Sequence, residues 1–217
     1  MVLSEKNSKP YRALYRRTEV EGYDDTAHVF AVDYYRPGSK GRDDFSRKEA
    51  WFYYMGDDEL EEEFSESLDK IIEDLFVDNT VEWDVMTLAP SDKKDGLNQN
   101  MLNICRDASE STGIEYRQLL RRSRDVYETG ELEGSMTRIA NLQDSIEVSG
   151  DVEGLNIILL DNVSIYGFKL AHMTEMLLDA GAERVFCVCL GVTNHERGVE
   201  DLEKGVTAST AVKAFGA

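Results

Sequence analysis

The sequence predicts an α/β protein whose mostly parallel sheet is covered by helices on both faces. Two apolar runs, 156–160 and 184–190, have the length and composition of strands that are buried on both faces. A helical pattern over 170–180 separates them, and parallel neighbours need a crossover of this kind. The chain has 217 residues, of which 41% are apolar, so it can bury one such core, which argues against disorder.

The N-terminal part carries one strand signal and one strong helix signal. β-branched and aromatic residues fill 28–36, which predicts a strand. The aromatic segment 45–55 fits either a strand or the entry to a helix. Over 57–76, apolar residues recur every three or four positions, which predicts an amphipathic helix whose acidic residues face solvent. Residues 1–26 carry few structural signals.

The middle of the chain alternates strand and helix signals. Residues 81–88 are expected to form a strand, 97–111 a helix and 116–120 a short strand. Residues 121–135 lack periodicity, and a loop of that length in a compact domain is usually functional or disordered. We therefore expect a mobile loop over 121–135.

We expect three parts along the chain. A small N-terminal cap occupies 1–80, the α/β core 81–193 and a C-terminal tail 194–217. No apolar run approaches the ~20 residues needed to span a bilayer. The polar N-terminus does not have the pattern of a secretory signal. These features predict a cytoplasmic protein.

The charge balance restricts the partners. The formal net charge is −19, which works against general binding to nucleic acid or to an anionic membrane. The acidic residues are spread over the whole chain, which is typical of a salt-adapted, halophilic surface. The three cysteines are an odd number, and two lie inside the apolar run 184–190, so we expect buried reduced thiols and no cysteine metal site.

A candidate ligand site follows the first apolar run. In open α/β sheets, ligands bind beyond the carboxyl ends of the strands. Asp161 closes the strand, and an acid there can accept hydrogen bonds from ligand hydroxyls. Gly167 permits a turn before the next helix, whose N–H groups and dipole attract an anion.

The segment 155–182, LNIILLDNVSIYGFKLAHMTEMLLDAGA, resembles the phosphoribosyl-pyrophosphate loop of class I phosphoribosyltransferases. That pattern has four apolar residues, two acids, a spacer, Thr-Thr-Gly-x-Thr and a helix that ends in Gly-Ala. Upstream, the stretches APS at 89–91, GLNQ at 96–99, LRR at 120–122 and RIAN at 138–141 resemble elements of the competence-protein-F subgroup, in the same order. The resemblance covers about 81–190.

The resemblance implies a mostly parallel phosphoribosyltransferase-like fold and a small-molecule ligand, phosphoribosyl pyrophosphate or a nucleotide. It implies a transferase that releases pyrophosphate, with Asp161 as the catalytic residue and Mg²⁺ held through the pyrophosphate substrate rather than by protein side chains. The residues that it places against the substrate are Asp161, Asn162, Ser164, Tyr166, Gly167, Lys169, Ser91, Lys93, Lys94, Arg121 and Arg122.

The loop departs from the family pattern at several positions. Asn162 replaces the second acid, Ile165 and Tyr166 replace two threonines, and Lys169 replaces the last one. Ile165 has no hydroxyl to donate, whereas Asn162 can bond a ligand hydroxyl and Lys169 can bring a charge to a phosphate. Asp95 stands where the upstream loop of the family has an arginine.

These departures keep other functions open. The alternative is a non-catalytic regulator or an adaptor in DNA uptake or processing, and a scaffold with a vestigial site is a third possibility. Structural roles also compete: Asp161 as an ion-pair partner, Gly167 as a simple turn, Lys169 as a solvated lysine and the arginines at 121–124 as partners of nearby acids. The acceptor substrate cannot be deduced from the sequence, and a homo-oligomer is the usual default for soluble assemblies.

Overall fold

The computed structural model describes residues 13–38, 41–76, 81–193, 199–202 and 206–215. Within them, one sheet has the strand order β4-β3-β7-β8-β2-β1-β9. Neighbours from β4 to β2 run parallel, whereas β1 pairs antiparallel with both β2 and β9. The strands are β1 (Ala13–Thr18), β2 (Ala27–Tyr34), β3 (Val85–Leu88), β4 (Glu115–Tyr116), β7 (Asn156–Ser164), β8 (Arg184–Val192) and β9 (Val199–Leu202).

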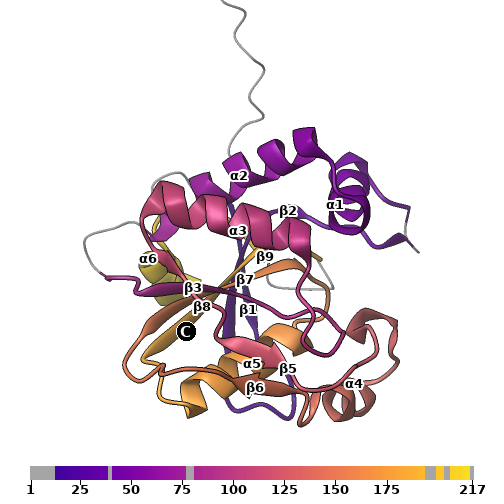
Figure 1. Cartoon of the computed structure of the whole chain (residues 1–217), viewed down its shortest axis with the longest axis vertical. Helices are drawn as coiled ribbons and strands as arrows, with labels where there is room; N and C mark the ends of the chain where they lie inside the picture. Colours follow the sequence, from indigo (N-terminus) through magenta and orange to yellow (C-terminus); the bar gives the residue numbers. More distant parts are fainter. Residues whose placement is uncertain (1–12, 39–40, 77–80, 194–198, 203–205, 216–217) are drawn as a thin grey trace, which may run out of the picture.

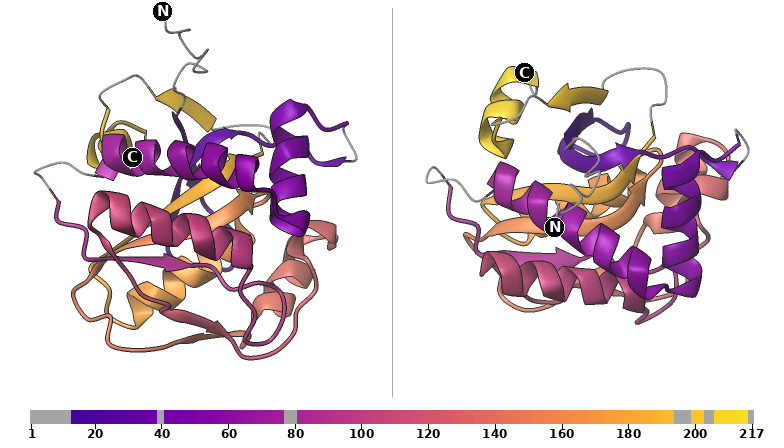
Figure 2. Two further views of the ribbon diagram at one scale, coloured as in Figure 1. Left: turned by 45° about the horizontal axis from the view of Figure 1, so that its top comes forward. Right: turned by 90° about the horizontal axis from the view of Figure 1, so that it is seen from above.

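Helices lie on both faces of this sheet (Figure 1). One face carries α1 (Asp44–Met55), α2 (Asp58–Phe76) and α3 (Gln99–Thr112), with α2 and α3 side by side (Figure 2). The other face carries α5 (Phe168–Asp179) and a small antiparallel sheet of β5 (Leu120–Arg122) and β6 (Ile146–Val148). The remaining helices are α4 (Ser135–Leu142), the 3₁₀ helix η2 (Thr129–Glu131) and α6 (Ala208–Phe215). The predicted α/β architecture is confirmed.

The apolar run of β7 shows why the centre of the sheet was predictable. Ile158 and Leu160 pack into the core beneath α2 and α3, and Ile157 and Leu159 pack into the core beneath α5. Side chains alternate between the two faces of a strand, so a strand covered on both sides needs an uninterrupted apolar run. None of the described helices is long and apolar enough to cross a bilayer. Cys105, Cys187 and Cys189 are free and buried, as expected.

The N-terminal part holds more structure than predicted. β1 lies within residues 1–26, where few signals were seen, and residues 1–12 lie outside the described part. The ambiguous segment 45–55 belongs to helix α1, whose N-cap Asp43 accepts a hydrogen bond from the Ser46 N–H. The three-part division of the chain stays a prediction. Even so, β2 lies between β8 and β1, so strands from both sides of residue 80 share one sheet.

The structure corrects the expectation of a loop without secondary structure over 121–135. This segment holds most of β5 and all of η2, and α4 begins at its last residue. Backbone hydrogen bonds from the Asp95 N–H to the Arg122 carbonyl (2.9 Å) and from the Val126 N–H to the Asp92 carbonyl (2.8 Å) tie it to the turn after β3. Such long-range pairing leaves no periodic signal in the sequence. Similarly, the predicted strand 116–120 is divided between β4 and β5, which belong to different sheets.

Candidate functional site

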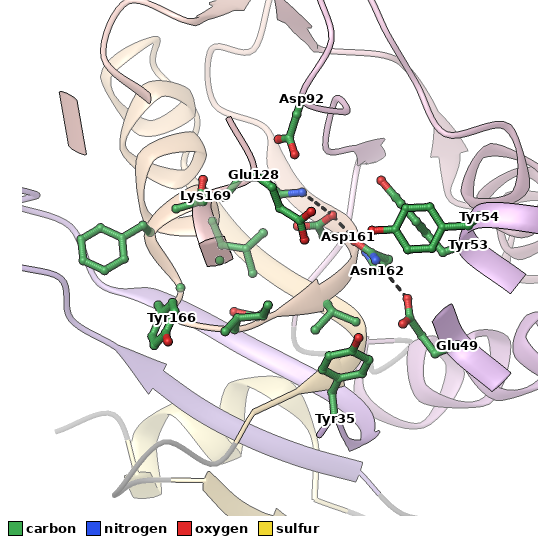
Figure 3. A pocket seen from close by; sticks show the side chains of 18 residues that line it. Tyr35, Glu49, Tyr53, Tyr54, Asp92, Glu128, Asp161, Asn162, Tyr166 and Lys169 are labelled. Atoms are coloured by element: carbon green, nitrogen blue, oxygen red, sulfur yellow. Dashed lines mark hydrogen bonds and ion pairs between the residues drawn. The ribbon is translucent and has the colours of Figure 1, made fainter. Parts of the chain in front are cut away.

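A cavity of about 240 Å³ lies at the carboxyl edge of the parallel strands (Figure 3). Its walls come from the ends of β2, β3 and β7, from α1, from residues 128–130 and from the first turn of α5. Strands that run parallel end at the same edge, and the topology therefore gathers side chains from distant parts of the chain there. The volume lies just below the ~300–1,000 Å³ that is typical of ligand pockets, so the cavity suits a small ligand.

Asp161 and Lys169 form an ion pair in this cavity. Lys169 Nζ lies 2.8 Å from Asp161 Oδ1, and their side chains are 20% and 6% exposed, so Lys169 is not the solvated lysine of the alternative reading. Burial disfavours the charge on Lys169, but nearby Asp161, Tyr53 and Asp92 outweigh it and raise the pKa of the ammonium. The other carboxylate oxygen of Asp161, Oδ2, is buried and has no hydrogen-bond partner among the described residues. That oxygen can accept a hydrogen bond from a ligand.

Asn162 reaches the other side of the cavity. Its Nδ2 donates to Glu49 Oε1 at 2.9 Å, so β7 is linked to α1. Glu49 is 1% exposed, and burial raises the pKa of its carboxyl to about 7, although the bond from Asn162 and the charge of Arg42 oppose the rise. Glu49 is therefore poised to exchange its proton near neutral pH.

The first turn of α5 forms the opposite end of the cavity. Gly167 is the N-cap of the helix, with φ +82°, and as a glycine it supplies no side-chain cap to the first N–H groups. A Cβ at Gly167 would clash with Thr18 Cγ2 on β1, so both the backbone conformation and the lack of space require glycine. Residues 165–170 line the cavity, and an uncapped helix N-terminus beside a cavity is suited to bind an anion.

Arg16 holds the turn before α5 from behind, a role that the sequence did not suggest. Arg16 is 8% exposed, and its guanidinium donates to four acceptors on three segments. The acceptors are Thr18 Oγ1, Ser164 Oγ, the Ile165 carbonyl and the Thr193 carbonyl. Burial lowers the pKa of Arg16 to about 10, so it stays charged at neutral pH. Ser164 thus serves the turn as an acceptor, and β1 rather than a ligand fixes the turn's shape.

Tyr166 lines the same end of the cavity and is 37% exposed. The guanidinium carbon of Arg138 lies 4.0 Å from the centroid of the Tyr166 ring, a cation–π distance. Arg138 also donates to the Thr129 carbonyl at 3.2 Å, so α4 and η2 are joined to this wall. The predicted residues Asp161, Asn162, Ser164, Tyr166, Gly167 and Lys169 therefore surround one cavity.

The upstream residues implied by the resemblance do not line the cavity. Lys93 and Lys94 are exposed; the ammonium of Lys93 lies 3.5 Å from Asp125 Oδ2, and the Lys94 N–H donates to Asp125 Oδ1. The hydroxyl of Ser91 accepts a hydrogen bond from the Lys93 N–H. From this turn it is Asp92, an acid, that lines the cavity.

The two arginines of β5 are occupied elsewhere. Arg121 is exposed and forms ion pairs with Asp95 and Glu147. Arg122 is fully buried and donates to the Ser91 carbonyl at 3.1 Å and to Ser145 Oγ at 2.7 Å. In this structure both arginines therefore contact the protein's own strands and turn, and their expected contact with the substrate stays a prediction.

Sequence reasoning missed half of the cavity wall. The missed side chains come from segments that carried no family motif, and they are mostly acidic or aromatic. They are Tyr35, Glu49, Tyr53, Tyr54, Asp92 and Glu128. With Asp161 they give the cavity four carboxyl groups, against one lysine among its lining residues.

The cavity offers carboxylate oxygens, which suit a magnesium ion held mainly by its substrate. Among the described residues, no group of three or more His, Cys, Asp or Glu side chains is arranged to hold a metal. Oxygen donors such as Asp161 Oδ2 suit Mg²⁺, which commonly binds through one or two carboxylates, waters and substrate phosphates.

No protein-family model matches this chain, and no curated protein matches it. The solved structures that it resembles are phosphoribosyltransferases and related enzymes. Glutamine phosphoribosylpyrophosphate amidotransferase from B. subtilis has a TM-score of 0.44 and 21% identity over 65% of this chain and 30% of that chain. A hypoxanthine-guanine phosphoribosyltransferase from Bacillus anthracis has a TM-score of 0.44 and 11% identity over 68% of this chain and 77% of that chain.

A third solved structure, the hypoxanthine phosphoribosyltransferase of Trypanosoma cruzi, has a TM-score of 0.38 and 10% identity over 68% of this chain and 73% of that chain. The chain spans only 25% of an allosteric regulatory enzyme of purine biosynthesis and 30% of the B. subtilis enzyme. At such identities and TM-scores, no ligand and no activity carries over from these proteins.

Proposed function

We propose that this protein has a phosphoribosyltransferase-like fold and binds the ribose 5-phosphate part of a nucleotide. The observation that carries the proposal is the position of Asp161 and Asn162 next to the uncapped N-terminus of α5. An acid and an amide suit ribose hydroxyls, and a helix N-terminus suits a phosphate. The sequence resemblance to the competence-protein-F-like subgroup supports the same assignment.

In the proposed complex, the phosphate lies against the N–H groups of residues 167–169. The hydroxyls of the ribose donate to Asp161 Oδ2, the buried oxygen that lacks a partner among the described residues. Lys169 lies within reach of both groups, because it pairs with Asp161 and belongs to the first turn of α5. Binding through Oδ2 thus leaves the ion pair between Lys169 and Asp161 Oδ1 in place.

A binding protein fits the cavity better than a transferase does. A transferase of this kind must hold pyrophosphate, yet Lys93, Lys94 and Arg121 do not line the cavity, and Asp92 and Glu128 do. Carboxylates repel a pyrophosphate unless a cation lies between them. We therefore favour the non-catalytic, nucleotide-sensing function over transfer.

Transfer remains the second candidate because one observation favours it. Asp161 lies in the C-terminal half of β7 and lines the cavity next to the proposed phosphate site, where the resemblance implies a residue that holds the ribose during the reaction. In that reaction, the bond between C1 of the ribose and a pyrophosphate oxygen breaks, and a nitrogen of the acceptor bonds to C1. A magnesium ion bound through the pyrophosphate oxygens would supply charge neutralisation, with Asp92 and Glu128 as the available protein carboxylates.

Calorimetric titration with two ligands tests the proposal. Ribose 5-phosphate alone, and phosphoribosyl pyrophosphate with Mg²⁺, are titrated into the native protein in molar KCl, the condition that the acidic composition favours. We expect both ligands to bind with similar affinity. We expect Asp161→Asn to weaken both at least a hundredfold and Asp74→Asn, which makes the same change on the exposed face of α2, to have no effect.

The outcomes separate the candidates. Phosphoribosyl pyrophosphate that binds at least tenfold more tightly with Mg²⁺ than ribose 5-phosphate, or that releases pyrophosphate when bases are added, would favour the transferase. Absence of heat with both ligands, while the protein stays folded by circular dichroism, would refute the proposed function.

A further inference from the structure

The end of the cavity remote from α5 has a distinct composition (Figure 3). Tyr53 and Tyr54 from α1 and Tyr35, which follows β2, lie there with the buried carboxyl of Glu49. The rings of Tyr53 and Tyr54 are 5.1 Å apart and almost perpendicular. This aromatic end offers flat apolar surfaces against which a planar ring can pack.

The charged groups at this end are acceptors. Asn162 donates a hydrogen bond to Oε1 of Glu49, and it is the partner found for this carboxylate among the described residues. The second oxygen, Oε2, can therefore accept a hydrogen bond from a ligand. Glu128 lines the cavity too, and its charge acts on Tyr54 and Lys169. Both carboxylates favour a ligand edge that carries N–H donors.

The nearby cations do not offset this preference. Lys169 is paired with Asp161 at the other side of the cavity. Arg42 forms a side-chain hydrogen bond with Tyr35, but it is exposed and is not among the lining residues. A ring edge rich in acceptors would therefore face carboxylates without a cation between them.

We propose that the aromatic end of the cavity selects a purine whose outer edge presents adjacent hydrogen-bond donors, as guanine does, with Glu49 as the residue that reads it. The inference rests on the proposed function, because it places the base of the nucleotide whose ribose 5-phosphate lies at Asp161 and α5. Guanine presents a ring N–H and an amino group side by side, a pattern that a carboxylate can accept with both oxygens. Hypoxanthine lacks the amino group, and adenine places an acceptor nitrogen next to its own.

The selection should depend on pH through Glu49. Its carboxyl has a pKa of about 7, set mainly by burial, and a protonated carboxyl offers a donor where the guanine edge needs an acceptor. The charged and titratable groups around it are Arg42, Asp161, Glu128, Tyr35 and Tyr54. Burial raises the pKa of both tyrosines, which therefore stay neutral between pH 6 and pH 8.

The test compares three nucleotides that share the same ribose phosphate. Guanosine, inosine and adenosine 5′-monophosphates are titrated calorimetrically into the full chain in molar KCl at pH 6 and pH 8. At pH 8 we expect guanosine monophosphate to bind about tenfold more tightly than inosine monophosphate, and adenosine monophosphate to bind most weakly. At pH 6 the ratio should shrink to about threefold or less. The phosphates titrate alike, so the ratio reports on the base.

Two variants assign the effect to Glu49. Glu49→Gln retains an Oε1 acceptor for Asn162 and places an amide where the base needs an acceptor. We expect it to bring guanosine and inosine monophosphates within about threefold of each other at pH 8 and to remove the pH dependence. Tyr54→Leu is the control, because it removes a stacking surface on an exposed side chain. It should weaken all three nucleotides and preserve their order.

Several results would overturn the inference. Adenosine or inosine monophosphate binding as tightly as guanosine monophosphate would refute the selection while leaving the ribose phosphate site intact. A preference that survives Glu49→Gln would remove Glu49 from the assignment. If none of the three binds and ribose 5-phosphate does not bind either, the proposed function itself is wrong.

Discussion

Two regions of the molecule resemble motifs of one family, and the structure uses them differently. Residues 161–169 surround a cavity with an acid, an amide and an uncapped helix N-terminus. The basic residues near 93 and 121, which the resemblance implies as substrate contacts, lie outside the cavity, and Lys93 and Arg121 are paired with acids on the surface. The comparison teaches that two segments with one family resemblance can differ in place, since residues 161–169 line a cavity and the basic residues near 93 and 121 do not.

The difference follows from where each region obtains its hydrogen bonds. The turn before α5 is held by Arg16 from β1, so the front of the turn is left open for a ligand. Arg122 is used inside the protein to bind Ser91 and Ser145. The turn at 161–169 is held by a residue outside the cavity wall, so its N–H groups stay available to a ligand. The arginine of the other region is already hydrogen-bonded to its own neighbours.

Replacing Arg16 should have the largest effect, because Arg16 holds the turn before α5. In Arg16→Met, four acceptors lose a charged donor, and we expect the free energy of unfolding to fall by about 3–4 kcal/mol. The measurement is urea unfolding in high salt. Arg17→Met on the same strand removes only a surface contact with Glu19 and should cost less than about 1 kcal/mol. Equal losses in the two variants would contradict the role assigned to Arg16.

The raised pKa of Glu49 predicts that the free energy of unfolding depends on pH. Its pKa is about 7 in the folded protein against the 4.5 of an unperturbed glutamate, so the folded state holds this proton more tightly than the unfolded chain does. The free energy of unfolding should therefore fall as pH rises from about 4.5 to 7, by at most about 3 kcal/mol. In Glu49→Gln this part of the pH dependence should vanish. An unchanged profile in the variant would show that Glu49 titrates normally.

A substitution at Gly167 tests the contact between β1 and the turn before α5. Alanine there would adopt a left-handed conformation and clash with Thr18, so we expect a loss of about 1–3 kcal/mol in unfolding free energy. Adding Thr18→Ser removes the clashing methyl group and keeps a hydroxyl acceptor for Arg16. The double variant should recover part of the loss. Complete absence of recovery would mean that the backbone conformation alone sets the cost.

The surface lysines should have the smallest effect. Lys93→Gln and Lys94→Gln should leave the affinity for ribose 5-phosphate unchanged within about twofold, because neither residue lines the cavity. Lys169→Met should lower that affinity more than tenfold, since Lys169 belongs to the cavity wall. Titration calorimetry measures all three. A larger loss from Lys93→Gln than from Lys169→Met would reverse the comparison between the two regions.

The sequence predicted the centre of the fold because its signals are local. β7 and β8 each contain an uninterrupted apolar run, and the apolar stripe of α2 recurs at helical spacing, so each element could be assigned by itself. The strand β1, which lies between β2 and β9, was missed because its buried positions include Arg16. Three of the four acceptors of Arg16 lie almost 150 residues or more away in the chain. A buried arginine has no local signature.

The sequence predicted about half of the residues that line the candidate site. Asp161 to Lys169 form one continuous segment, and a motif can identify such a segment. Glu49 and Tyr54 enter the cavity only because α1 packs beside the end of β7, a contact that depends on the tertiary fold. The basic residues near 93 and 121 were expected in the site for their chemistry, and ion pairs with local acids placed them elsewhere.

A crystal structure of the native protein with guanosine 5′-monophosphate tests the central claim most directly. We predict that the phosphate lies ~3 Å from the backbone nitrogens of residues 167–169. We predict that a ribose hydroxyl contacts Asp161 and that the base lies beside Tyr54 and Glu49. A phosphate bound among Lys93, Lys94 and Arg121, with the cavity beside α5 free of ligand, would contradict the claim.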